Sequence, residues 1–213
     1  AHELRTPLAV IQTNLEVFAR RETPALKDYQ EIFAMLQEQT GRLSHLAEIL
    51  LDMTGVQTVE RSERISLAAL TDEVFCDLAS VAEQKDVELI QQEGDCIITG
   101  SYLLLYRAVY NLVENAIKYN HSGGKVTVNI HPSEEITDTS TSVNYVFLEV
   151  SDTGIGIPPE YQEKIFTPFF RVDKSRSRAM GGAGLGLALV SEIVRQHNGQ
   201  VKVLESSKKG SIF

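Results

Sequence analysis

The sequence predicts an α+β protein in which an antiparallel helical hairpin precedes a mixed α/β domain. Two observations lead to this fold class. Up to about Gln57 the apolar residues recur at helical spacings, and beyond Gly55 short strand patterns alternate with helical ones. The chain has 213 residues, 43% of them hydrophobic, which is enough to form a core in each of two domains. We place the hairpin at residues 1–57 and the second domain at residues 58–213.

The hairpin is predicted from two apolar stripes separated by a break at residues 21–24. The first stripe consists of Leu4, Leu8, Ile11, Leu15 and Phe18. The second follows a mostly heptad-like spacing and consists of Ile32, Leu36, Leu43, Leu46, Leu50 and Met53. One hairpin leaves apolar surface uncovered, so we expect a homodimer in which two hairpins form a four-helix bundle.

The second domain is expected to begin with a strand over 64–67 and a helix over 70–85, opened by Ser66 or Thr71. Short strands over 87–90 and 97–99 follow. Ser101 is the expected N-cap of a helix that ends at Lys118.

The remaining elements are a β-hairpin and a helix-rich C-terminal part. The hairpin pairs 125–130 with 145–150 across a polar loop, and a short helix follows from Pro158 to about Phe166. A helix from Gly184 to Asn198, a strand over 201–205 and a strand from Ser211 onward close the chain. Because this last strand stops at Phe213, we expect the chain to be a piece of a longer protein.

Composition excludes several functional classes. The formal charge of 20 − 29 = −9 disfavours a nucleic-acid partner. Only Cys76 and Cys96 occur, without the spacing of a zinc or redox site, which indicates a reducing compartment. No apolar run approaches the ~20 residues that span a bilayer, so no membrane contact is expected of this chain.

The first motif, at residues 2–8, places a histidine and an acid at the start of the first helix. His2 and Thr6 share a face, and Pro7 should loosen the helix beside them. A zinc-protease helix would need a second histidine where Thr6 stands, so zinc is rejected. Taken alone, a helical histidine is usually an ordinary surface residue.

The second motif lies on the helix that ends at Lys118. Asn111, Asn115 and Lys118 fall on one stripe, although asparagine disfavours helix interiors. A magnesium ion bound through oxygen and carrying phosphate would explain this pattern. The alternative is a solvated polar face.

Two glycine-rich segments, 151–158 and 180–187, follow a strand and precede a helix, respectively. Glycines let backbone N–H groups approach a phosphate, but neither segment is a Rossmann or P-loop fingerprint. Between them Arg171, Lys174, Arg176 and Arg178 face only Asp173. We interpret this patch as a lid over nucleotide phosphates, the alternative being a solvated loop.

Together these segments resemble the cytoplasmic core of a bacterial sensor histidine kinase of a two-component system. The matching motifs are the H box at 2–8, the N box at 111–120, the glycine boxes at 152–156 and 182–187, and the F box at 166–171. The resemblance implies an ATP-binding α/β sandwich of the type shared with gyrase, heat-shock and mismatch-repair ATPases. It also implies a cytoplasmic location within a membrane-anchored parent.

The resemblance implies a role for each motif residue. His2 becomes the phosphoacceptor, Glu3 its base, and Thr6 a participant in dephosphorylating the partner regulator. Asp152 would accept from the adenine amino group, and Arg171 would stabilise charge on the transferring group. The remaining implied contacts are Asn111 and Asn115 to Mg²⁺, Lys118 to phosphate, Tyr119 to the nucleotide, and the phosphate and lid walls formed by Gly154, Gly156, Gly182, Gly184, Leu185, Gly186 and Leu187.

The predicted function is therefore ATP-dependent autophosphorylation of His2, transfer to an aspartate of a response regulator, and an additional phosphatase activity. One alternative is a related ATPase that hydrolyses ATP to change conformation, which would carry a glutamate where Asn111 stands. Another is a non-catalytic dimeric scaffold that binds a regulator, which would not bind ATP.

Overall fold

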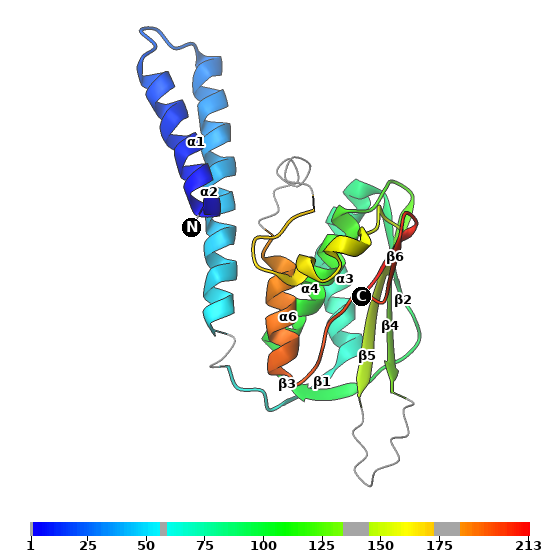
Figure 1. The fold of residues 1–213 in the computed structure, drawn as a ribbon. Helices are drawn as coiled ribbons and strands as arrows, with labels where there is room; N and C mark the ends of the chain where they lie inside the picture. Colours follow the sequence, from blue (N-terminus) through cyan, green and yellow to red (C-terminus); the bar gives the residue numbers. More distant parts are fainter. Residues whose placement is uncertain (1, 56–58, 134–144, 173–183) are drawn as a thin grey trace.

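Two antiparallel helices, α1 (His2–Ala19) and α2 (Leu26–Gly55), form the N-terminal hairpin of the computed structural model (Figure 1). The structure describes residues 2–55, 59–133, 145–172 and 184–213, and the expected domain boundary between residues 57 and 58 lies outside them. The connection is held by an ion pair between Arg21 and Asp28 and by the Ala25 N–H, which donates to Asp28 Oδ2 over 2.8 Å. The predicted hairpin is confirmed.

Several large apolar side chains of the hairpin are exposed to solvent in the single chain. Leu8 and Leu15 on α1 are 53% and 43% exposed, and Phe33 on α2 is 62% exposed. Large apolar side chains left exposed on both helices of the hairpin fit an interaction surface.

The second part is a sandwich of three helices on a sheet (Figure 1). The helices are α3 (Leu67–Lys85), α4 (Tyr102–Lys118) and α6 (Gly186–Gln196). The strands in sheet order are β2 (Val87–Gln91), β4 (Gly124–Pro132), β5 (Val146–Asp152), β7 (Gly210–Ile212) and β6 (Glu205–Ser207). Only the β2–β4 pair is parallel within this sheet. The chain also forms a small antiparallel sheet of β1 (Glu63–Ser66) and β3 (Ile97–Gly100), and the 3₁₀ helices η1 (Pro159–Tyr161) and η2 (Lys164–Phe166).

The core lies between the helices and one face of the sheet. Residues of β4 alternate between buried and more exposed positions, as expected of a strand covered on one side. Val126 and Val128 are fully buried there and belong to the same cluster as Val74 of α3 and Ile117 of α4. This packing holds α4 against the sheet, so it positions the polar residues that α4 presents elsewhere.

Most predicted elements are confirmed, with four corrections. Ser66 is the N-cap of α3, where its Oγ accepts from the Ala69 N–H. Thr71 is not a cap, because it lies inside the helix and its hydroxyl donates to the Leu67 carbonyl. The helix expected from Gly184 begins at Gly186, and the one expected from Pro158 is two separate 3₁₀ turns.

The strand expected over 201–205 was the fourth correction, since β6 spans only Glu205–Ser207. Glu205 pairs with Ile212 in antiparallel register, so Leu204 is opposite Phe213. The Leu204 N–H donates to the Ile212 carbonyl over 2.8 Å, so the chain runs alongside β7 just before β6 begins.

No helix within the described ranges is both long enough and apolar enough to cross a membrane.

Candidate functional site

The centre of the candidate site is the approach of α4 to the first turn of α6. Asn111 donates through Nδ2 to the Arg107 carbonyl over 2.8 Å, which directs its Oδ1 toward Gly186. A Cβ added at Gly186 would lie 2.5 Å from Asn111 Oδ1 and 3.8 Å from Asn115 Nδ2. Both asparagines therefore face the start of α6, and a side chain at position 186 would displace Asn111 Oδ1.

The C-terminal end of α4 contacts the first glycine segment. The Ile155 N–H donates to the Tyr119 carbonyl over 3.2 Å, and a Cβ at Gly154 would lie 2.5 Å from that oxygen. Lys118 Nζ lies 5.9 Å from the centre of the Tyr119 ring. The cation, the ring and the glycine turn are thus gathered at one end of α4.

Asp152 ends β5 beside this turn. Its Oδ1 accepts from the Gly154 N–H over 2.7 Å. Burial raises the pKa of the Asp152 carboxyl, although hydrogen bonds from the backbone of Gly154 and Ser211 oppose that rise. A half-buried acceptor of this kind suits recognition of a ligand donor.

Gly156 lies against the β6–β7 hairpin. Its φ is +71°, and a Cβ there would lie 1.8 Å from the Ser207 carbonyl oxygen. The adjacent Ile157 N–H donates to Ser206 Oγ over 2.7 Å. This glycine therefore allows the loop to attach closely to the edge of the sheet.

The second glycine segment is joined to the end of the predicted F box. The Phe169 N–H donates to the Gly184 carbonyl over 2.7 Å, and Gly184 has a φ of +71°. A Cβ at Gly184 would lie 3.0 Å from Arg171 Cγ, so Arg171 stands beside this turn. Leu185 is fully buried and Leu187 packs against the core, so both are packing residues at the start of α6. Gly182, with Lys174, Arg176 and Arg178, lies outside the described residues.

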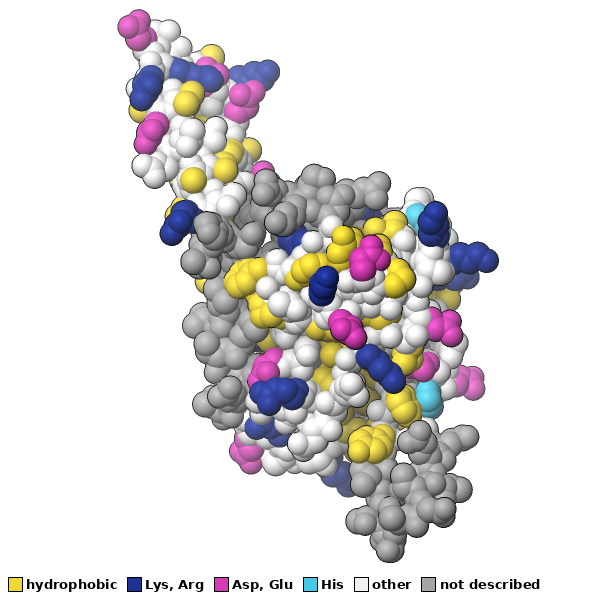
Figure 2. Space-filling view, in the orientation of Figure 1, with side chains coloured by type: hydrophobic (Ala, Val, Ile, Leu, Met, Phe, Trp, Pro, Cys, Tyr) yellow, Lys and Arg dark blue, Asp and Glu magenta, His cyan; other side chains and the backbone are white. Residues whose placement is uncertain are grey.

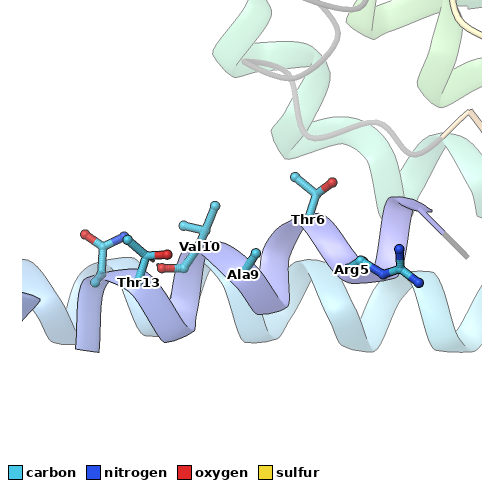
Figure 3. Close-up of a pocket in the computed structure, with 6 residues that line it drawn as sticks. Arg5, Thr6, Ala9, Val10 and Thr13 are labelled. Carbon is cyan, nitrogen blue, oxygen red and sulfur yellow. Dashed lines mark hydrogen bonds between the residues drawn. The ribbon is translucent and has the colours of Figure 1, made fainter. Parts of the chain in front are cut away.

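His2 and Glu3 form the first turn of α1, a different element from the rest of the set. Farther along α1 a hollow of about 460 Å³ opens on the helix surface (Figure 3). Its lining residues are Arg5, Thr6, Ala9, Val10, Thr13 and Asn14. The structure therefore places the predicted site residues in two groups, one around α4 and α6 and one on α1.

Lys85 was not predicted to take part in this site. It ends α3, and its Nζ donates to the Lys118 carbonyl over 3.4 Å. A cation at a helix C-terminus satisfies a carbonyl without an intrahelical partner. No sequence pattern links two lysines so far apart, because only the packing of α3 on α4 brings them together.

The donor set limits which metal ion could bind. Within the described ranges no three His, Cys, Asp or Glu side chains are grouped as metal ligands. The amide oxygens of Asn111 and Asn115 are hard ligands, and Mg²⁺ is commonly held by a few protein oxygens together with phosphate and water. The residues present thus fit a magnesium ion that arrives with a phosphate ligand.

Two family models match the chain. The His Kinase A (phospho-acceptor) domain matches residues 1–58, and the histidine kinase-, DNA gyrase B-, and HSP90-like ATPase family matches residues 100–213. Over 219 residues the chain is 35% identical to the sensor histidine kinase RppB of Synechocystis sp., covering 100% of this chain and 46% of RppB. The chain spans about half the length of the curated relatives it matches.

Solved structures share the fold. The histidine kinase AdeS of Acinetobacter baumannii has a TM-score of 0.72 at 24% identity, over 100% of this chain and 95% of that chain. The histidine kinase ThkA, solved in complex with the response regulator protein TrrA, has a TM-score of 0.72 at 22% identity. The match covers 100% of this chain and 57% of that chain. These likenesses confirm the predicted hairpin and sandwich.

Proposed function

This chain belongs to the sensor histidine kinases of two-component signalling, and from that premise we propose that it transfers the terminal phosphoryl group of ATP to His2. The phosphoryl group then passes to an aspartate of a response regulator. The ATPase family to which residues 100–213 belong implies ATP binding. The observation that carries the proposal is the pairing of Asn111 and Asn115 with Gly186, in a chain whose first helix begins with His2.

In the proposed reaction the imidazole of His2 is the nucleophile. Neutral imidazole is nucleophilic near pH 7, and a carboxylate on one ring nitrogen leaves the other free to attack. The attacking nitrogen forms a bond to the terminal phosphorus, the bond to the bridging oxygen breaks, and ADP leaves. Glu3 orients the ring and takes its proton.

The nucleotide is proposed to lie between α4, α6 and the first glycine segment. Asp152 accepts from the adenine amino group, which favours ATP over GTP, and Tyr119 lies against the nucleotide. Lys118 and the glycine turns contact the phosphates, while Arg171 stabilises charge on the transferring group. Mg²⁺, when held by Asn111 and Asn115, neutralises charge on the phosphate oxygens.

The alternative of an ATPase without a protein acceptor is less well supported. That chemistry uses a glutamate where Asn111 stands, and Asn111 has no acid–base capacity. Its Nδ2 is also engaged with the Arg107 carbonyl. These features favour a ligand role over activation of water.

The surface of α1 is proposed to dock the response regulator. The hollow lined by Arg5, Thr6 and Thr13 lies along the same helix as His2, so a receiver domain seated there would stand close to the phosphohistidine. Thr6 is also proposed to take part in dephosphorylating the regulator. We further propose a homodimer through the hairpins and a cytoplasmic location inside a membrane-anchored parent.

The test is the chemical stability of the labelled protein. With ATP carrying a labelled terminal phosphate, the chain should acquire label that acid removes and base does not. His2→Gln should lose that label while still binding nucleotide. The matched control His121→Gln, an exposed histidine of the second domain, should label normally. Acid-stable label, or label that survives His2→Gln, would contradict the assignment.

A further inference from the structure

Helix α4 carries a row of three tyrosines on the side that faces α3. Tyr102, Tyr106 and Tyr110 are spaced four residues apart, and all three are half-buried. Successive ring centres are 6.4 Å and 6.0 Å apart. The row therefore extends along α4 almost to Asn111.

Two of these tyrosines are attached to acids on α3. The Tyr102 hydroxyl donates to Glu73 and the Tyr106 hydroxyl donates to Asp77. We call these two pairs the tyrosine–carboxylate clamp. The hydrogen bond to Glu73 raises the pKa of Tyr102 to about 12, and burial with the hydrogen bond to Asp77 raises the pKa of Tyr106. Both hydroxyls therefore remain protonated donors at neutral pH.

The apolar contacts beneath the clamp do not by themselves fix how α4 is turned about its axis. Leu70, Val74 and Leu78 of α3 belong to the same buried cluster as Leu105 and Ala108 of α4. Hydrophobic contact is non-directional, whereas a hydrogen bond weakens steeply when its geometry is lost. Two bonds one turn apart on both helices resist rotation of α4.

Rotation of α4 would move the asparagines that face α6. Asn111 lies five positions after Tyr106, which places the two residues about 140° apart around the helix axis. A side-chain head lies about 5 Å from that axis, so a turn of about 10° displaces it by about 1 Å. Asn111 Oδ1 lies close to Gly186, where an added Cβ would approach it to 2.5 Å, so a shift of this size changes how the asparagine faces the start of α6.

We infer that the tyrosine–carboxylate clamp sets the rotation of α4 and thereby positions Asn111 and Asn115 for the magnesium-bound phosphates. Tyr102, Tyr106, Glu73 and Asp77 are positioning residues that touch neither nucleotide nor metal. The inference rests on the proposed function, because it assigns the asparagines to magnesium and phosphate. It predicts that loss of the clamp weakens magnesium-assisted binding and leaves recognition of the adenine by Asp152 in place.

The experiment measures the affinity for the β,γ-imido analogue of ATP by calorimetry, once with Mg²⁺ and once with EDTA. The ratio of the two dissociation constants is the magnesium enhancement. In the double variant Tyr102→Phe/Tyr106→Phe, which keeps both rings, this enhancement should decrease by about tenfold, the scale expected of an ångström-sized misplacement. The affinity in EDTA should decrease by a smaller factor, because rotation of α4 also displaces Lys118 whereas Asp152 lies on β5.

Two controls separate the clamp from general packing. Tyr110→Phe removes a hydroxyl that donates no hydrogen bond within the described residues, so its enhancement should equal that of the unmodified chain. Glu73→Gln/Asp77→Asn keeps an oxygen that accepts from each tyrosine and should also retain the enhancement. Melting temperatures of all variants verify that each one is folded.

Unchanged enhancement in Tyr102→Phe/Tyr106→Phe would overturn the inference. Equal losses of affinity with Mg²⁺ and with EDTA would also overturn it, because the effect would then not depend on the metal. The same loss of enhancement in Tyr110→Phe would overturn it as well, because the effect would then not depend on the clamp. If the unmodified chain shows no magnesium enhancement, the assignment of Asn111 and Asn115 to magnesium fails, and the inference fails with it. The inference is supported if the unmodified chain shows the magnesium enhancement and Tyr102→Phe/Tyr106→Phe loses it while Tyr110→Phe keeps it.

Discussion

At the scale of single residues, α4 uses different side chains for packing and for the proposed contacts to the ligand. Asn115 stands on α4 beside Asn111, and both face the first turn of α6. Their neighbours Leu112, Val113 and Ala116 are buried in the core. The side chains that hold α4 in place are therefore separate from those proposed to hold the ligand, and the two roles can be tested independently.

Asn115→Ala should abolish autophosphorylation and leave the melting temperature near that of the unmodified chain. Loss of one preorganised polar contact to the reacting phosphate costs about 10²–10³ in rate. Incorporation of labelled phosphate measures the effect. The control is Glu114→Gln on the same helix, which should label normally, because the proposed reaction needs no general base there. Normal labelling of Asn115→Ala would show that this asparagine holds no metal.

Asp152→Asn should weaken ATP binding by about tenfold or more, because it replaces an acceptor of a charge-assisted hydrogen bond. The same change should raise the melting temperature at pH 7. Burial raises the pKa of Asp152 in the folded chain, so the folded chain favours the protonated carboxyl. The stability that this carboxyl contributes is therefore fully present below the ordinary aspartate pKa of about 4. It is lost as the pH rises through the raised pKa.

The difference in melting temperature between Asp152→Asn and the unmodified chain should therefore shrink as the pH falls toward 4. Melting curves between pH 4 and pH 8 measure it. Asp72→Asn, at an exposed position of α3, is the matched control and should show no such trend. A variant that is less stable at pH 7 than at pH 4, relative to the unmodified chain, would contradict this account of Asp152.

At the scale of elements, the site depends on how closely α4 and α6 approach. Gly186→Ala places a Cβ 2.5 Å from Asn111 Oδ1, so the asparagine or the helix must move. We expect a loss of magnesium-assisted nucleotide affinity of about tenfold, the scale of a displacement near 1 Å. Calorimetry with the imido analogue of ATP measures it.

The matched glycine is Gly41 on α2, where a Cβ would meet nothing within 4 Å. Gly41→Ala should leave nucleotide affinity unchanged and raise the stability of the hairpin by up to about 1 kcal/mol, the difference in helix propensity. Equal affinities for Gly186→Ala and Gly41→Ala would show that the close approach at Gly186 does not shape the site.

At the scale of the whole molecule, the hairpin and the sandwich carry different parts of the proposed reaction. His2 begins α1, whereas the asparagines lie on α4 in the sandwich. In the space-filling view, apolar side chains are visible on the hairpin between its charged groups (Figure 2). The exposed Leu8, Leu15 and Phe33 are the residues expected to bind a second copy of the chain.

Leu15→Glu should convert the dimer to a monomer, because it would bury a carboxylate in an apolar interface. Light scattering should give twice the mass of one chain for the unmodified protein and the mass of one chain for the variant. Val81→Glu on α3, which is 40% exposed compared with 43% for Leu15, is the control and should remain dimeric. Equal masses for all three proteins would contradict the proposed interface.

Much of this molecule was predictable from local patterns. The cap at Ser101, the end of the helix at Lys118 and the pairing of β4 with β5 follow from capping chemistry and from strand alternation, which act over a few residues. The motif residues were also recognisable, because glycines and helical asparagines are unusual where they stand. The helix expected from Pro158 to about Phe166 shows the limit, since the structure forms two separate 3₁₀ turns there.

By itself the sequence determined which residues are chemically able to act and which segments become helices or strands, because propensities, caps and periodicity depend on near neighbours. Only the tertiary structure decided that Gly186 would face Asn111, that Asp152 would be half-buried with a raised pKa, and that Tyr106 would bind Asp77. These relations join residues far apart in the chain. They arise when α3, α4 and α6 bury their apolar faces on one sheet, and that packing sets the angle at which each helix presents its polar side.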